Sequence, residues 1–148
     1  MEDVHLTISG SAPLSTEVLD FLRAVLGTVV VEGYGATETA GATGLQVSWD
    51  YSSGMSFTLP CHPLGNIGGP LPCCDFKVVD VPEMNYFAVD KHHYDIPCIA
   101  RGELCVRGYN ICPEYLDNPE ETQAAFDSEG YFHTGDIAVI LPNYSFKV

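Results

Sequence analysis

The sequence predicts an α/β unit followed by a mostly-β unit, and two patterns carry this prediction. Residues 1–48 give a strand, a helix, a second strand and then a glycine-rich stretch, which is the order typical of α/β proteins. Residues 49–148 contain short alternating segments separated by prolines, which is typical of small sheets and barrels. We therefore expect two units with a boundary near Trp49.

The first unit begins with an apolar–polar alternation over residues 4–8, which predicts a strand. Residues 10–13 are Gly-Ser-Ala-Pro and predict a turn. Ser15 can cap a helix that Gly27 ends. The apolar positions of this helix share one face, and they are Val18, Leu19, Leu22, Val25 and Leu26.

A second buried strand is expected over residues 29–31, directly before the glycine-rich stretch 33–44. This order places the glycine-rich stretch where α/β sheets bind their ligands. A single strand–helix–strand unit lacks the neighbouring strands that a buried sheet needs, and an alternating pattern continues over 144–148. We therefore expect the sequence to be a piece of a larger protein.

The second unit is expected to hold strands over 76–79, 103–107 and 131–141. Residues 118–121 are Asn-Pro-Glu-Glu, with a cap, a proline and an acid at the positions that begin helices. Residues 83–100 show little regular pattern and are expected to form an exposed loop.

The charge of the chain excludes some partners. Its 20 acidic residues against 6 lysines and arginines give a formal net charge of −14, which repels nucleic acid and anionic lipid. The same field would repel ATP unless a cation intervened. The longest apolar run, residues 137–141, is too short to span a bilayer, and the acidic start Met1-Glu2-Asp3 does not resemble a secretion signal. We expect a soluble intracellular segment with no transmembrane span.

The cysteines do not have the spacing of a zinc site. None forms a C-x-x-C pair, and the six are Cys61, Cys73, Cys74, Cys98, Cys105 and Cys112. An alternative metal site could draw on Cys61, His62, His92, His93 and Cys98. We favour ordinary buried thiols in a reducing compartment.

Four segments together resemble the AMP-forming acyl-CoA synthetases. They are Gly-Tyr-Gly-Ala-Thr-Glu-Thr-Ala-Gly at 33–41, Ser-Gly-Ser-Ala-Pro-Leu-Ser at 9–15, Arg-Gly-Glu-Leu-Cys-Val-Arg-Gly at 101–108 and Tyr-Phe-His-Thr-Gly-Asp at 131–136. Their order and spacing match the family, and four motifs in register are much more specific than one. The motif at 33–41, with residues 68–84, resembles the long-chain fatty-acid–CoA ligases.

This resemblance implies a portion of the N-terminal domain of an adenylate-forming enzyme, made of a βαβ piece and a distorted β-barrel subdomain. It also implies a reaction in which a fatty carboxylate attacks Mg²⁺-bound ATP to give acyl-AMP, after which the co-substrate CoA displaces AMP. The substrate is its own nucleophile, and we expect His133 and the cysteines to form no catalytic group. The parent enzyme is expected on a membrane surface such as the endoplasmic reticulum or peroxisome.

By resemblance, Glu38 is a catalytic residue that holds the magnesium ion, and carboxylate oxygen suits this hard cation. Thr37 is the second catalytic residue and contacts the α-phosphate. Gly33 and Gly35 let the backbone approach the ligand, because a Cβ would collide there. The alternatives are an acid at a helix start for Glu38 and ordinary turn residues for the others.

The resemblance also places Tyr34 against the adenine ring and Asp136 on the two ribose hydroxyls. The alternatives are a core tyrosine and a plain turn. The loop of small residues 11–13 is expected to line the other face of adenine, or else to be only a turn. The full set expected at the nucleotide is Ser11, Ala12, Pro13, Gly33, Tyr34, Gly35, Ala36, Thr37 and Asp136.

Other positions of the motifs are expected to be structural. Arg101, Gly102 and Glu103 flank a barrel strand, where the two charges could form a weak surface ion pair. Tyr109 and Glu114 stand where the family usually has proline and glycine, which is expected to alter a turn without touching a phosphate contact.

The family's lysine-bearing phosphate loop, hinge and C-terminal domain are not in the sequence, so we expect the isolated chain to be inactive and to show no ATP–pyrophosphate exchange with palmitate. Two alternatives stay open. One is an adenylate-binding module without catalysis, and the other is an adenylating enzyme for a different carboxylic acid.

Overall fold

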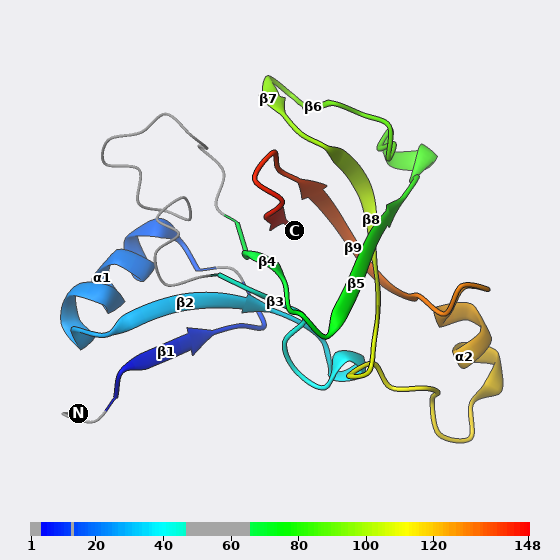
Figure 1. Ribbon diagram of the computed structural model, residues 1–148, viewed down its shortest axis with the longest axis horizontal. Helices are drawn as coiled ribbons and strands as arrows, with labels where there is room; N and C mark the ends of the chain where they lie inside the picture. Colours follow the sequence, from blue (N-terminus) through cyan, green and yellow to red (C-terminus); the bar gives the residue numbers. More distant parts are fainter. Residues whose placement is uncertain (1–3, 13, 47–65) are drawn as a thin grey trace.

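The computed structural model describes residues 4–12, 14–46 and 66–148, which form two four-stranded sheets and a small hairpin (Figure 1). The first sheet has the order β1 (Leu6–Ser9), β2 (Val29–Tyr34), β3 (Gly44–Leu45), β4 (Gly69–Pro70). The second has the order β10 (Phe146–Lys147), β9 (Phe132–Ile140), β8 (Ala100–Gly108), β5 (Cys74–Val79). The hairpin pairs β6 (His92–His93) with β7 (Ile96–Pro97).

The predicted strand–helix–strand unit is confirmed. Helix α1 (Thr16–Leu26) begins after Ser15, whose Oγ accepts from the Val18 amide at 3.4 Å, and it ends at Gly27 with a left-handed φ of 61°. β1 and β2 pair in parallel. Arg23 joins the helix to the sheet, because its Nε and Nη2 both donate to the Val30 carbonyl at 3.2 Å.

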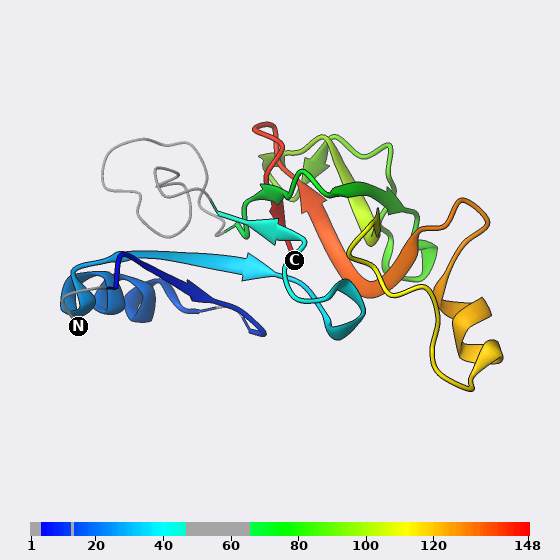
Figure 2. The same cartoon turned by 60° about the horizontal axis from the view of Figure 1, so that its bottom comes forward.

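The outer side of this unit is apolar and exposed. Ile8 on β1 and Phe21 on α1 are 55% and 62% exposed, and β1 has no neighbour on its far side among the described residues. Figure 2 shows β1 along the edge of the molecule, away from the second sheet. The sequence indicates that a single strand–helix–strand unit cannot bury its own apolar faces. The exposed side chains of Ile8 and Phe21 agree with this, because no described element covers them.

The second sheet is antiparallel and curled, with β8 at its centre between β5 and β9 (Figure 2). Its core consists of Leu104, Val106, Ala138 and Phe146, all at most 3% exposed. The Phe76 ring packs against the Phe146 ring with centroids 5.0 Å apart. The predicted strands over 76–79, 103–107 and 131–141 all lie in this sheet with small shifts at their ends, which confirms the expected mostly-β unit.

A bulge interrupts β9 and shapes the site described below. Cys105 pairs with His133 and Glu103 pairs with Ile137, so that three residues of β9 lie opposite the single residue Leu104. Extra residues in one strand bend it and direct side chains out of the ladder. Gly135 within the bulge has a φ of 74°, a conformation that glycine adopts without strain.

The expectation of an exposed loop over 83–100 was only partly right. This segment holds most of a short 3₁₀ turn, Pro82–Met84, and the β6–β7 hairpin, and it buries His93 and Cys98 to 8% and 6% exposure. Arg101 anchors it, with Nε 2.5 Å from Asp90 Oδ2. The hairpin was missed because two-residue strands are too short to show a period. The predicted boundary near Trp49 falls outside the described residues and stays a prediction.

The turn between helix α2 (Pro119–Ala125) and β9 provides a test of pH dependence. Asp127 Oδ2 lies 2.5 Å from Lys77 Nζ, and Asp127 Oδ1 accepts from the amides of Glu129 and Tyr131 at 2.9 Å. The ammonium of Lys77, followed by the Tyr131 amide, lowers the pKa of Asp127 from 3.8 to about 2. The native state therefore prefers the ionised carboxylate.

We predict that Asp127→Asn lowers the urea midpoint at pH 7. A lowered pKa stabilises the fold above the unfolded value and loses that effect as pH falls through the folded value. The difference between wild type and variant should therefore shrink from pH 4 towards pH 2. Urea titrations across this range measure it, and a difference that does not change with pH would contradict the assignment.

Candidate nucleotide site

A cavity of about 220 Å³ lies between the two sheets, at the C-terminal end of β2. Its walls come from the loop after β1, from the end of β2 and from the bulge of β9. The lining residues are Ser9, Ser11, Ala12, Glu32, Gly33, Tyr34, Gly35, Ile67, Asp136 and Val148. The expected adenine and ribose residues of the described chain therefore share one cavity.

Tyr34 and Asp136 are in direct contact across this cavity. The Tyr34 hydroxyl donates to Asp136 Oδ2 at 2.5 Å, although the two residues are 102 positions apart in the sequence. Burial, and then the hydrogen bond to the carboxylate, raise the pKa of Tyr34 well above its usual value. The Asp136 amide donates to Thr134 Oγ1 at 3.1 Å, and Thr134 Oγ1 donates to the Leu104 carbonyl at 2.8 Å. Asp136 is thus held by both sheets.

The loop after β1 is held in place by Glu32, a residue that sequence reasoning did not single out. Glu32 Oε1 accepts from the Leu14 amide at 3.0 Å, and Oε2 accepts from Gln46 Nε2 at 3.2 Å. Ser11 within this loop has a φ of 72°, which is unusual for a residue other than glycine. Such conformations cost free energy and gather at ligand sites. Pro13, the third expected residue of the loop, lies outside the described residues.

A second cleft of about 640 Å³ adjoins the first and shares Ser9, Ser11 and residues 33–35 with it. Ala36, Thr37 and Glu38 line this cleft. Asp136 therefore lines the cavity, Glu38 lines the adjoining cleft, and residues 33–35 line both.

Residues 36–41 form a compact turn around Thr39, which is only 1% exposed. The Ala36 amide donates to Thr39 Oγ1 at 2.8 Å, and the Thr39 hydroxyl lies 2.9 Å from the Ala36 carbonyl oxygen and 2.8 Å from that of Gly41. Thr39 therefore fixes the backbone that presents Thr37 and Glu38 to the cleft. The sequence does not reveal this role, because the hydrogen bonds of the Thr39 side chain depend on how the turn folds.

Glu38 is held by the loop that follows β8 of the second sheet. The Tyr115 hydroxyl donates to Glu38 Oε1 at 2.9 Å, and the Cys112 amide donates to the Glu38 carbonyl at 2.7 Å. The hydrogen bond to the carboxylate is the main cause that raises the pKa of Tyr115 to about 12. Sequence reasoning missed Tyr115 because it is 77 residues from Glu38.

The loop that carries Tyr115 also bears the two departures from the family pattern. Tyr109 is fully exposed and Glu114 is exposed, so these two side chains point away from the turn. Asn110 of the same loop contacts the turn directly, because its Nδ2 donates to the Thr39 carbonyl at 2.9 Å.

One further expectation needs correction, and one contact was not expected. Arg101 and Glu103 do not pair with each other: Arg101 binds Asp90, and Glu103 Oε2 lies 3.0 Å from His133 Nδ1. Cys105 Sγ lies 3.5 Å from the same nitrogen, so a cysteine and His133 do come together. The register of β8 and β9 creates this cluster, which no spacing in the sequence reveals. Burial raises the pKa of Cys105 to about 12, so its thiol is not an activated nucleophile.

Comparison with known proteins gives consistent matches. A family model described as AMP-binding enzyme matches residues 1–116. Human long-chain-fatty-acid–CoA ligase 6 is 44% identical over 146 residues, which are 98% of this chain and 18% of the ligase. The chain thus spans less than a fifth of the length of this curated relative.

One similar solved structure is the adenylation domain of a carboxylic acid reductase from Segniliparus rugosus, in complex with AMP and a co-purified carboxylic acid. It aligns with a TM-score of 0.67 and 31% sequence identity. The alignment covers 95% of this chain and 18% of that one. A malonyl-CoA ligase with methylmalonyl-CoA and AMP bound aligns with a TM-score of 0.68 at 31% identity, over 96% of this chain and 26% of that one.

The fold is therefore that of a part of the N-terminal domain of adenylate-forming enzymes, including the curled half-barrel sheet. The chain belongs to the AMP-binding enzyme family, whose members use ATP, and it is homologous over nearly its whole length to long-chain fatty-acid–CoA ligases. No helix in the described residues of the chain is long and apolar enough to cross a membrane.

Proposed function

We propose that this chain provides the adenosine- and phosphate-facing wall of a long-chain fatty-acid–CoA ligase, which converts a fatty acid, ATP and CoA into acyl-CoA, AMP and pyrophosphate through acyl-AMP. The observation that carries the proposal is that Asp136 on β9 lines the cavity and Glu38 after β2 lines the adjoining cleft, with residues 33–35 lining both. The relatives' names and the AMP bound in similar structures support it.

In this proposal Asp136 accepts hydrogen bonds from both ribose hydroxyls through its two carboxylate oxygens. Tyr34 offers its ring to one face of adenine, and Ser11 and Ala12 border the other face. The 2.5 Å hydrogen bond from the Tyr34 hydroxyl already holds Asp136 in one orientation. A preorganised acceptor loses less entropy on binding.

The phosphate side fits a magnesium ion. Glu38 offers a carboxylate oxygen, which is the donor that Mg²⁺ prefers, at a cleft where Tyr115 already orients the carboxylate. When bound, the ion neutralises charge on the ATP phosphates. Thr37 and Ala36 border the same cleft, where the hydroxyl and backbone amide of Thr37 would contact the α-phosphate.

The chemistry needs no nucleophile from the protein. The fatty carboxylate oxygen attacks the α-phosphorus and pyrophosphate leaves, and the CoA thiol then attacks the acyl carbon and releases AMP. The protein contributes position and charge complementarity. We assign the adenine and phosphate loops to the segment 1–48 and the ribose aspartate to the segment 49–148. Because long acyl chains partition into bilayers, the proposal includes a parent enzyme that works at a membrane surface.

The test is AMP binding by the chain, measured by isothermal titration calorimetry. Asp136→Asn should weaken AMP binding by about 10- to 100-fold, because an amide cannot replace a carboxylate as acceptor for both hydroxyls. Asp95→Asn, at an exposed turn between β6 and β7, removes the same charge and should leave the affinity unchanged. Equal affinities of Asp136→Asn and wild type would overturn the proposed site.

A further inference from the structure

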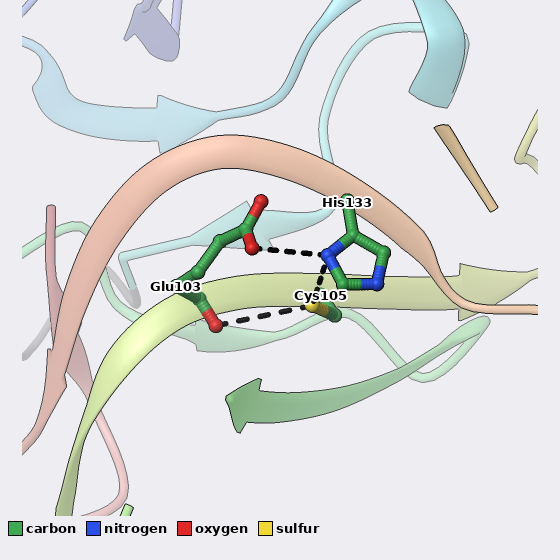
Figure 3. Close-up of side chains that lie close together, drawn as sticks. All are labelled: Glu103, Cys105 and His133. Carbon is green, nitrogen blue, oxygen red and sulfur yellow. Dashed lines mark hydrogen bonds and ion pairs between the residues drawn. The ribbon is translucent and has the colours of Figure 1, made fainter. Parts of the chain in front are cut away.

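Three side chains with metal-binding atoms meet where β8 and β9 face each other, outside the nucleotide site (Figure 3). Glu103 and Cys105 project from β8, and His133 projects from the paired position of β9. His133 Nδ1 lies 3.5 Å from Cys105 Sγ and 3.0 Å from Glu103 Oε2. Each of the three offers one atom, and all three atoms lie within 4.8 Å of one another.

Hydrogen bonding leaves the thiol of this cluster with only a weak bond. Nδ1 of a histidine carries either one proton or one lone pair, yet here it has both a thiol and a carboxylate as neighbours. When the Nδ1 proton goes to the carboxylate, the thiol keeps only its long 3.9 Å hydrogen bond to the Glu103 carbonyl oxygen. A cation between the three atoms would instead use one lone pair from each residue.

The separations fit a tetrahedral zinc ion. With Zn–S of about 2.3 Å and Zn–N and Zn–O of about 2.0–2.1 Å, neighbouring ligands on a tetrahedron lie about 3.5 Å apart for S and N and about 3.3 Å apart for N and O. The observed distances are 3.5 Å and 3.0 Å. Small side-chain rotations would therefore complete the coordination.

A carboxylate lies near the second ring nitrogen of His133. Asp127 Oδ2 lies 4.0 Å from His133 Nε2, the nitrogen that would keep its proton when Nδ1 binds metal. Metal-binding histidines usually donate that proton to a carboxylate, which fixes the ring. Besides the ligand Glu103, the charges that act on Cys105 are those of Asp127 and Lys77, one carboxylate and one ammonium.

We propose that Glu103, Cys105 and His133 bind one Zn²⁺, with water as the fourth ligand. Thiolate with imidazole suits zinc and excludes magnesium, which requires oxygen ligands. The His133 side chain is 30% exposed and gives solvent access to the fourth position, whereas Cys105 is fully buried. Binding forms a Zn–S bond and releases the thiol proton to the buffer.

The site is also connected to the ribose side of the cavity. Glu103 Oε1 accepts from the Gly135 amide at 3.1 Å, within the bulge that carries Asp136. A metal on Oε2 would hold Glu103 in this position and thereby hold the bulge. Zinc at this site therefore stiffens a loop of the nucleotide site without touching the nucleotide.

Cobalt(II) is the probe, because a thiolate–cobalt bond gives a near-ultraviolet charge-transfer band and tetrahedral cobalt gives strong visible bands. The reduced 148-residue chain should bind one Co²⁺, and one equivalent of Zn²⁺ should displace it and remove both bands. Cys105→Ser should remove the charge-transfer band. His133→Gln should weaken Co²⁺ binding by at least about tenfold, as the loss of a ligand at a metal site does.

Matched controls separate this site from other thiols. Cys98→Ser changes another buried cysteine, and Cys73→Ser changes the exposed member of the adjacent pair, and both should keep the bands. Circular dichroism melts establish that each variant is folded, and His133→Gln tests the site even if Cys105→Ser does not fold. Absence of the bands in the wild type, or bands that persist in folded His133→Gln at wild-type affinity, would overturn the proposal.

Discussion

Gly35→Ala should be the most damaging single substitution in the glycine-rich loop. A Cβ placed on Gly35 would lie 1.6 Å from the Gly41 carbonyl oxygen and 2.9 Å from the Ala42 Cα. Both are backbone atoms, so no side-chain rotation can relieve the clash. We expect a loss of at least about 3 kcal/mol of unfolding free energy, at the upper end of overpacking effects, together with loss of AMP binding.

Gly33→Ala is the matched control, since it adds the same methyl group two residues earlier. Its Cβ would meet Leu45 Cδ1 at 3.3 Å and Ile8 Cγ2 at 3.5 Å, which are the ends of flexible side chains. We expect a change below about 1 kcal/mol in urea unfolding. If the two variants were equally stable, the 36–41 turn would not have the tight packing described here.

The difference between Gly35 and Gly33 gives a structural reason for glycine at position 35. The sequence suggested that a side chain there would collide with the ligand, whereas the structure shows a collision with the chain itself. The motif was recognisable, but its physical cause was not, because the contact with Gly41 depends on how residues 36–41 fold back. Gly33 has no comparable constraint within the described residues.

Local features of the fold were predictable because they depend on neighbouring residues. The cap at Ser15, the stop at Gly27 and the helix beginning after Asn118 all follow from hydrogen bonds that close within four residues. The hairpin over 92–97 was missed because its strands are two residues long. The pairing of β4 with β3 was not predicted either, because a sheet contact between residues far apart in the sequence leaves no local pattern.

The site was predictable only as a set of motifs. Tyr34 and Asp136 stand out by resemblance, but their 2.5 Å contact depends on a bulge in β9 that brings the second sheet to the end of β2. Tyr115 and Glu32, which hold the expected residues in place, belong to no motif singled out in the sequence. A residue that positions another is identified by the hydrogen bond between them. When the two are far apart in the sequence, only the folded structure shows that bond.

Glu38→Gln should abolish the magnesium dependence of ATP binding. The Glu38 carboxylate lines the cleft that we assign to the phosphates, and an amide oxygen carries no charge to hold a hard cation. We expect wild-type chain to bind ATP at least about tenfold more tightly with Mg²⁺ than with EDTA, and Glu38→Gln to show no difference. AMP binding, which relies on the adenosine side, should change little.

Tyr115→Phe separates the role of the Glu38 carboxylate from that of the hydrogen bond that orients it. Removing the hydroxyl takes away the 2.9 Å hydrogen bond to Glu38 Oε1 but leaves the charge, so the magnesium effect should become several-fold smaller rather than disappear. Glu120→Gln, at an exposed carboxylate on α2, removes the same charge as Glu38→Gln and should behave as wild type. Calorimetric ATP titrations with and without Mg²⁺ rank the four proteins, and a magnesium effect that survives intact in Glu38→Gln would place the ion elsewhere.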